Sequence, residues 1–259
     1  MSIGKKIIIG ISIVLILAVL FFLGSFIVGQ IAYESDMKTS VTNEQTKQIK
    51  GNKEEEKGEK ELGLAVKEAE QKGLLLLVNK ENPLEPNYRP EDLAPIKYYA
   101  EDRTPGARFM RQEAAEHFHG MVEAAEKNGI SVVMTTAYRD YDFQKTLYDN
   151  YVSNEGQAEA DKFSAKPGQS EHQTGLAVDV TSASVGYALT YEFGQSQEGK
   201  WLAEHAHEFG FILRFPEDKR EITGYNYEPW HFRYVGQDIA REIYKEKITL
   251  EEFIDRMED

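Results

Sequence analysis

The longest apolar run of the chain lies at its N-terminus. From Ile7 to Gly29 no residue carries a charge, and two lysines precede the run. About 20 apolar residues suffice to cross a bilayer, and positive charge stays on the cytoplasmic side. The pattern predicts a transmembrane signal-anchor over residues 1–32, a single pass through the cell membrane, and an extracytoplasmic remainder. A signal peptide cleaved near Ala32 is the alternative, and it predicts the same side of the membrane.

Polar and charged residues dominate the next segment, residues 33–61. It reads YESDMKTSVTNEQTKQIKGNKEEEKGEKE and holds few large apolar side chains. Such a composition cannot bury enough surface to offset the entropy that a backbone loses on ordering. We expect a flexible polar linker, in which the charge run KEEEKGEK is a solvated tether rather than a binding site.

Apolar residues recur at regular spacing beyond this segment, which predicts one folded domain over residues 62–259. A spacing of three or four residues predicts helices: 62–71, 105–128, one that follows Asp140, 198–209, 238–245 and 249–257. Short β-branched or aromatic runs predict strands: 74–78, 130–140, 176–181, 211–215 and 230–235. Because these elements alternate irregularly and the strands are short, we expect an α+β fold with a small, mostly antiparallel sheet flanked by helices.

Several predicted helices carry end signals of their own. Pro105 suits a first helical turn, and the dipeptide at residues 128–129, Asn-Gly, is a typical stop. Asp140 can cap the helix that follows it. The sequence TLEE, which begins at Thr249, has the spacing of a capping box.

Composition narrows the chemistry that is open to the domain. The chain has 259 residues, a net charge of −14 and no cysteine. The acidic charge argues against a nucleic-acid partner and against docking on anionic lipid headgroups. The lack of cysteine excludes disulfides, zinc–thiolate sites and a cysteine nucleophile. A metal would have to be held by histidine and carboxylate ligands.

The six histidines fall into two groups. His117 and His119, like His205 and His207, are two residues apart on predicted helices, so the two members of a pair point to different sides and cannot bind one ion together. We interpret these four as surface or boundary residues. The remaining two, His172 and His231, lie where loops meet strands.

A carboxylate accompanies each of these two histidines. Asp179 ends an apolar run seven residues after His172, and Gly175 allows the chain to turn between them. Glu228 precedes His231 by three residues in YNYEPWHFRY. Two histidines and one carboxylate form a ligand set of catalytic zinc, and a free glutamate beside them can move a proton. The spacing alone also allows a simpler interpretation, in which the aspartate caps a turn and the second histidine pairs with an acidic neighbour.

Two segments carry a family resemblance. PGQSEHQTGLAVDV and GYNYEPWHFRYVG contain the patterns S-x-H-x-x-G-x-A-x-D and E-x-W-H. Together they resemble the VanY-type D-alanyl-D-alanine carboxypeptidases, zinc peptidases of the superfamily that includes lysostaphin-like enzymes and the Hedgehog domain. The segments LLLVNKENPLEPNY, TTAYRDYDFQKTLY and WLAEHAHEFGFILRFP are similar to this family too, so the resemblance spans about Leu74 to Gly236.

The resemblance implies a role for individual residues. It implies that one Zn²⁺ per chain is bound by His172, Asp179 and His231, and that Glu228 is the general base for a zinc-activated water. It implies that Arg139 faces the substrate carbonyl or developing negative charge; a salt bridge from this arginine to Asp140 or Asp142 is the alternative. Ser170 and Gln144 match family positions that hold the terminal carboxylate of the peptide.

The function that the resemblance implies is that of a membrane-anchored, extracytoplasmic carboxypeptidase. It would remove the terminal D-alanine from peptidoglycan stem peptides. An L,D-carboxypeptidase that acts on the tetrapeptide stem and an endopeptidase that cuts within the stem are alternatives on the same scaffold. A zinc-stabilised wall-binding module is the non-enzyme alternative, although such a module needs no general base at Glu228. No protein partner can be inferred from the sequence.

Overall fold

The computed structural model describes residues 20–30, 33, 37, 48, 53–54, 56–101 and 105–258. The chain divides into two compact units, Met1–Glu61 and Leu62–Asp259. Much of the predicted signal-anchor and of the predicted linker lies outside the described residues. In the part of the chain that is described, no helix combines the length and the apolar character needed to cross a membrane.

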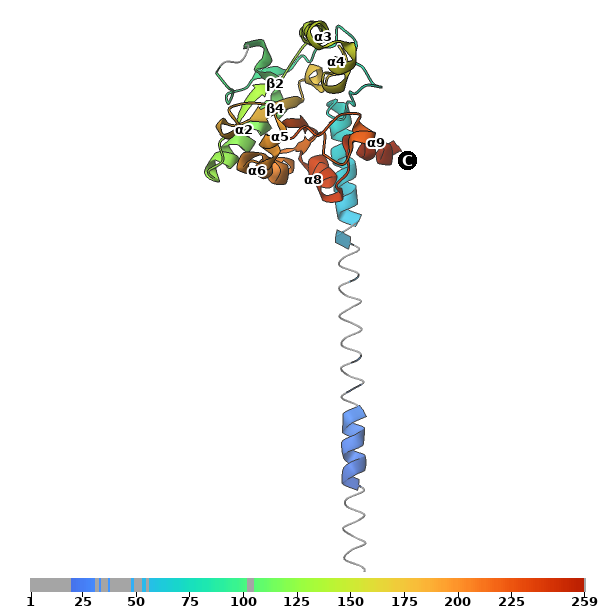
Figure 1. Cartoon of the computed structure of the whole chain (residues 1–259). Coiled ribbons are helices and arrows are strands. Elements are labelled where there is room, and N and C mark those ends of the chain that lie inside the picture. Colours follow the sequence, from blue (N-terminus) through green and yellow to red (C-terminus); the bar gives the residue numbers. More distant parts are fainter. Residues whose placement is uncertain are drawn as a thin grey trace, which may run out of the picture. The chain divides into compact units, whose positions relative to one another are not determined.

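The second unit is an α+β fold with two small antiparallel sheets flanked by helices (Figure 1). A helix over residues 56–71 leads into it. The further α-helices are α2 (Gln112–Lys127), α3 (Tyr141–Glu155), α4 (Gln157–Phe163), α5 (Tyr191–Gln195), α6 (Gln197–His205), α7 (Arg220–Thr223), α8 (Gln237–Glu246) and α9 (Leu250–Glu258). Short 3₁₀ helices are η1 (Pro105–Ala107), η2 (Glu171–Thr174), η3 (Ala183–Val185) and η4 (Ala206–Phe209).

The larger sheet has four strands in the order β3-β4-β6-β5, and all neighbours are antiparallel. Its strands are β3 (Val133–Thr136), β4 (Ala177–Thr181), β6 (His231–Tyr234) and β5 (Phe211–Leu213). The central pair, β4 and β6, sets Asp179 directly opposite His231. A second sheet pairs β1 (Leu93–Pro95) with β2 (Phe109–Arg111). The predicted antiparallel sheet is therefore confirmed, and two candidate site residues lie at one register position.

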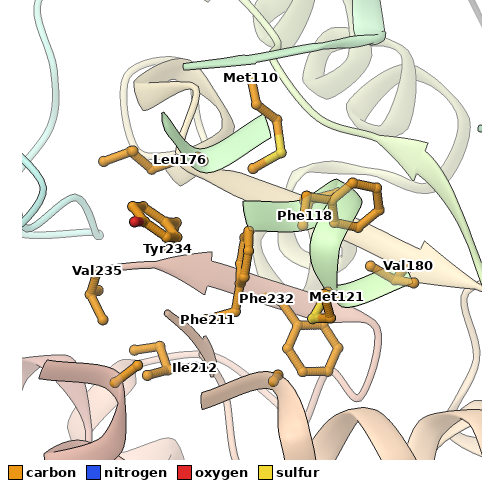
Figure 2. Packing of buried hydrophobic residues seen from close by; sticks show 14 of the residues in the cluster. Met110, Phe118, Met121, Leu176, Val180, Phe211, Ile212, Phe232, Tyr234 and Val235 are labelled. Atoms are coloured by element: carbon orange, nitrogen blue, oxygen red, sulfur yellow. The ribbon is translucent and has the colours of Figure 1, made fainter. Parts of the chain in front are cut away.

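The hydrophobic core lies between this sheet and the helices (Figure 2). Helix α2 contributes Phe118, whose ring meets that of Phe211 from β5 edge to face, with centroids 6.3 Å apart. On β4, Val178 and Val180 belong to the core cluster, whereas Asp179 lies between them in sequence and belongs to the site. Strand alternation thus separates core residues from a candidate site residue.

Two of the predicted helix caps form as expected. The Asp140 side chain accepts a hydrogen bond of 2.8 Å from the Phe143 backbone N–H at the start of α3. Before α9, the Thr249 hydroxyl accepts from the Glu252 N–H and the Glu252 carboxylate accepts from the Thr249 N–H. Both donors at the start of α9 are thereby satisfied, which completes the capping box.

Two predicted elements are wrong. Residues 74–78 form turns and an irregular segment rather than a strand, and the carbonyls of Leu74 and Leu76 accept hydrogen bonds from the Arg233 guanidinium instead of from a neighbouring strand. The predicted helix over 105–128 begins only at Gln112. The three residues before it form β2, because Phe109–Arg111 pairs with Leu93–Pro95.

Candidate active site

Three elements bring the predicted metal ligands together. His172 lies on η2, Asp179 in the middle of β4 and His231 at the start of β6. Gly175 ends η2 with φ of 68°, and a Cβ there would lie 3.0 Å from the Leu93 side chain. The turn therefore requires a residue without a side chain, and it returns the chain to the strand that carries the aspartate.

The ligand atoms of these three residues lie within 4.8 Å of one another. The Nε2 atom of His172 is 3.3 Å from Asp179 Oδ2, and the Nδ1 atom of His231 is 3.1 Å from Asp179 Oδ1. All three side chains are buried. A buried carboxylate flanked by two imidazole nitrogens is a ligand set that suits zinc and leaves a position open for a further ligand.

Hydrogen bonds fix which ring nitrogen faces the cluster. Nδ1 of His172 lies 2.6 Å from the carbonyl oxygen of Ala137. Because a carbonyl only accepts, Nδ1 carries the proton and the lone pair of Nε2 points to the cluster. Nε2 of His231 is 3.2 Å from Glu171 Oε2, so its Nδ1 is the nitrogen that faces Asp179. Such partners orient imidazole ligands in metal sites, and the residues present fit a zinc ion.

The charges of the cluster support the same interpretation. Burial lowers the pKa of His172 to about 4, with Arg139 adding to the effect, so this imidazole is neutral at pH 7. Although burial opposes it, the two histidines lower the pKa of Asp179 below its usual range. Burial also opposes the charge of His231, but its hydrogen bonds to Asp179 and Glu171 raise the pKa to about 9. A metal binds a deprotonated imidazole nitrogen, so zinc binding at Nδ1 of His231 is coupled to release of a proton.

Glu228 lies at the edge of the cluster without joining it. Its Oε2 is 4.0 Å from His231 Nδ1. The Glu228 backbone N–H donates to the Phe215 carbonyl, and its own carbonyl accepts from the His231 N–H, so the segment between them is a tight turn. Burial raises the pKa of Glu228 to about 7, despite an opposing effect of His231. This carboxylate can therefore take up and release a proton near neutral pH.

Arg139 approaches the cluster from the end of β3. Its Nη1 is 3.8 Å from Asp179 Oδ2, and its Nη2 is 3.4 Å from the Ser170 hydroxyl, to which it donates. Its Nε is buried and has no hydrogen-bond partner. The ion pair that the structure contains is therefore with a metal-site carboxylate, and the guanidinium keeps a donor that a substrate can use.

Gln144 is buried on α3, and its Nε2 donates to the Ala165 carbonyl at 2.7 Å. Its Oε1 is buried without a partner. An amide oxygen accepts hydrogen bonds and does not donate, so the amide would have to exchange its two atoms to hold a carboxylate. The role of Gln144 in carboxylate binding stays a prediction.

All seven predicted site residues line one cleft of about 350 Å³. Tyr191, Tyr227 and Trp230 line another part of the cleft wall. The rings of the two tyrosines are nearly parallel, with centroids 6.3 Å apart. A second groove shares these tyrosines and extends past Glu217 and Arg220. The cleft therefore continues beyond the metal cluster on the side of the aromatic residues.

Sequence reasoning missed a buried charged cluster beside His231. Glu171 contacts this histidine as well as Arg214 and Arg233, and Arg214 also contacts Glu251. No motif marks these residues, because they come from four separate segments. The one available signal was that Arg214 and Arg233 lie within predicted buried strands, where an arginine requires a partner.

Comparison with known proteins identifies the family. The family model described as "VanY: D-alanyl-D-alanine carboxypeptidase" matches residues 107–237. The protein YodJ of Bacillus subtilis (strain 168) is 43% identical over 185 residues, which are 71% of this chain and 68% of that protein. The LdcB LD-carboxypeptidase, whose structure concerns peptidoglycan recognition, is 43% identical with a TM-score of 0.66, and the match covers 69% of this chain and 84% of LdcB.

The vancomycin resistance D,D-pentapeptidase VanY supplies the metal and the ligand for comparison. A mutant from the VanB-type cassette, in complex with Zn(II), is 33% identical with a TM-score of 0.58, and the match covers 70% of this chain and 98% of that one. The VanYB structure holds D-alanine-D-alanine and is 31% identical with a TM-score of 0.57, covering 70% and 97%. The family match, the Zn(II) of this relative and the His-Asp-His cluster agree. The chain therefore belongs to the VanY D-alanyl-D-alanine carboxypeptidase family and is a zinc carboxypeptidase.

Proposed function

We propose that this protein is held in the cell membrane by its N-terminal segment and removes the terminal D-alanine from peptidoglycan stem peptides outside the cytoplasm. The observation that carries the proposal is the joint placement of a His-Asp-His cluster, Glu228 and Arg139 on one cleft. The uncharged run from Ile7 to Gly29 supports the anchor.

Each side chain has a task that its position supports. When bound, zinc polarises a carbonyl oxygen and lowers the pKa of water. Glu228 takes the proton of the attacking water on its carboxylate and delivers it to the leaving amine. Arg139 places its free donor next to the developing negative charge, where a fixed positive group is most effective.

The lining of the cleft suggests the direction of the peptide. Arg139 and Ser170 provide a positive charge and a hydroxyl side by side, which suit the terminal carboxylate. Another part of the cleft wall is aromatic, and Tyr191 and Tyr227 there also line the second groove. We expect the preceding residues of the stem to leave along this aromatic wall.

Two stem peptides are candidate substrates. The family description supports the pentapeptide, whose last bond joins two D-alanines. The second candidate is the tetrapeptide, and the similarity to the L,D-carboxypeptidase LdcB favours it, since that identity of 43% exceeds the 33% to VanY. Both reactions use the same cluster and release one D-alanine, and they differ in the residue that precedes the cut bond.

The test uses the full-length protein in detergent, loaded with zinc, and synthetic penta- and tetrapeptide stems. Mass spectrometry should show loss of one alanine from at least one of the two peptides. Glu228→Gln should lower the rate by about 100-fold or more, the effect of a lost general base, with zinc content unchanged. Glu221→Gln, at an exposed glutamate outside the cleft, is the matched control and should retain full activity.

Three outcomes would contradict parts of the proposal. Unchanged hydrolysis by Glu228→Gln would remove the general-base role. Products from a cut inside the stem would indicate an endopeptidase. Bound zinc without turnover on either peptide would point to a wall-binding module.

A further inference from the structure

A cluster of four fully or almost fully buried charged residues lies behind the metal ligand His231. It consists of Glu171, Arg214, Arg233 and Glu251, and we call it the Glu171 cluster. Both arginines are 0% exposed, and Glu171 is 3% exposed. Its members come from η2, the residue after β5, strand β6 and helix α9.

The two oxygens of Glu171 have separate partners. Oε1 accepts hydrogen bonds of 2.8 Å from Arg214 Nε and of 2.8 Å from Arg233 Nη1. Oε2 lies 3.2 Å from His231 Nε2. The arginines thus saturate one oxygen and leave the other directed at the imidazole. Two guanidinium groups beside a carboxylate favour its ionised form, which only accepts hydrogen bonds, so Oε2 accepts from the imidazole N–H.

Each arginine is itself fixed by a second anchor. Arg214 forms two hydrogen bonds with Glu251 on α9, of 2.8 and 2.6 Å. Arg233 donates to the carbonyls of Leu74 and Leu76. With both arginines held at two points, the carboxylate of Glu171 has little freedom to rotate.

Stability alone is a poor reason for such a cluster. Removing charges from water is costly, and well-packed apolar residues often stabilise a core as well as a buried ion pair does. The cluster contains two positive and two negative side chains, which balance without the metal site. What the arrangement adds is a carboxylate oxygen directed at the ring nitrogen of a metal ligand.

We infer that Glu171 is a positioning residue, held by Arg214 and Arg233, that keeps His231 protonated at Nε2 and presents its Nδ1 to the metal. The inference rests on the metal site of the proposed function. Glu171 does not bind the metal itself, because the imidazole ring stands between it and Asp179. Among the described residues, the group able to hold an ion contains His172, Asp179 and His231 and not Glu171.

The first test is the zinc affinity of the full-length protein, measured by competition with a chromophoric chelator. Loss of a partner that orients a ligand typically costs 10- to 100-fold in metal affinity. We therefore expect Glu171→Gln to weaken zinc binding by about 10- to 100-fold. Glu171→Asp keeps the charge that the arginines need but shortens the reach to Nε2, and it should weaken zinc binding as well.

The matched control is Glu251→Gln. This variant, like Glu171→Gln, removes a negatively charged partner of Arg214. Unlike Glu171, however, Glu251 does not contact His231. The thermal stability of Glu251→Gln should fall in the same way as that of Glu171→Gln, whereas its zinc affinity should stay within about threefold of wild type, well below the 10- to 100-fold loss expected for a lost orienting partner. A role in folding alone would change both variants equally.

A second measurement needs no variant. In the cobalt(II)-substituted wild-type protein, ring N–H protons of coordinated histidines give shifted NMR signals. Two slowly exchanging signals are expected, from His172 Nδ1–H on the Ala137 carbonyl and from His231 Nε2–H on Glu171. In Glu171→Gln one of them should exchange faster with solvent, while Glu251→Gln should keep both.

These measurements distinguish failure of the metal site from failure of the positioning role of Glu171. A wild-type protein that binds neither zinc nor cobalt would overturn the metal site itself. Zinc bound by wild type with unchanged affinity in Glu171→Gln would overturn the positioning role only. An equal loss of affinity in Glu251→Gln, or a single protected ring N–H in wild type, would also overturn it.

Discussion

At the scale of single residues, Arg139 lies between Asp179 of the metal cluster and Ser170. It reaches Asp179 and Ser170 with its two terminal nitrogens, and its Nε has no partner. An arginine presents several donors in a fixed plane, whereas a lysine offers one flexible point charge. The geometry of this guanidinium therefore matters as well as its charge.

Arg139→Lys distinguishes the two roles of this residue. We expect kcat to fall by about 100-fold, which is the effect of losing one donor to a developing oxyanion. Zinc content should stay at wild-type level, because the arginine is not a ligand. A raised KM with unchanged kcat would instead assign Arg139 to binding of the terminal carboxylate in the ground state.

Glu113 gives a prediction of pH dependence outside the site. Although burial opposes it, hydrogen bonds from Lys72 and Tyr234 lower the pKa of Glu113 below its ordinary value of 4.5. A carboxylate with a lowered folded-state pKa adds stability above the unfolded pKa and loses it as pH falls through the folded pKa.

The variant Glu113→Gln should therefore have a lower free energy of unfolding than wild type at pH 7, and the difference should shrink below about pH 4.5. Urea unfolding at pH 7, 5 and 4 measures it. Glu126→Gln, on an exposed position of the same helix, is the control. A difference that is constant with pH would assign the effect to packing rather than to charge.

Residues with a motif could be predicted from the sequence, and residues without one could not. The family pattern in two short segments predicts His172, Asp179 and His231. The structure places these three side chains together. Glu171 is adjacent to one of these ligands, yet its partners come from residues 43 to 62 positions away. A contact of that kind depends on strand pairing, which a single sequence does not specify.

At the scale of elements, α5 supports the turn that carries Glu228. Gly194 lies on this helix, and a Cβ there would lie 2.5 Å from the Tyr227 hydroxyl and 2.9 Å from Pro229 Cβ. These two residues flank Glu228 in sequence. A methyl group at position 194 must therefore displace the turn.

We expect Gly194→Ala to lower kcat/KM by about 10- to 100-fold, because small displacements of catalytic groups are costly. Its zinc content should be unchanged. Gly120→Ala on α2 is the control, since the nearest atom to its added methyl is 3.9 Å away. That variant should gain about 0.5–1 kcal/mol in the free energy of unfolding and keep full activity. Full activity of Gly194→Ala would show that the turn does not depend on α5.

Element prediction succeeded where local signals agree with the tertiary structure. The capping box at Thr249 is local, and α9 begins where it predicts. The segment 74–78 has the composition of a buried strand, but no strand pairs with it and Arg233 satisfies two of its carbonyls. Phe109 and Met110 fit a helical stripe in the sequence, yet they pair with β1. In both failures a long-range partner overrides the local pattern.

At the scale of the whole molecule, the proposed membrane anchor would decide where the enzyme works. With a net charge of −14, the protein should not adsorb to anionic membranes, so retention there would require the apolar N-terminus. We expect the full chain to remain with the membrane after a high-salt wash. Intact mass should show that residues 1–32 are present. A secreted form that begins near Ala32 would contradict the anchor and support a cleaved signal peptide.

The register of the central strands has a consequence for folding. Asp179 and His231 face each other across β4 and β6, and 52 positions of chain separate them. A metal bound to both residues cross-links the two ends of that chain segment. The metal site forms only when the two strands pair correctly. A ligand that binds only the native state adds about 2.7 kcal/mol at a free concentration 100 times its Kd. The melting temperature of this enzyme should therefore rise with the free zinc concentration, so metal binding can be measured without any substrate.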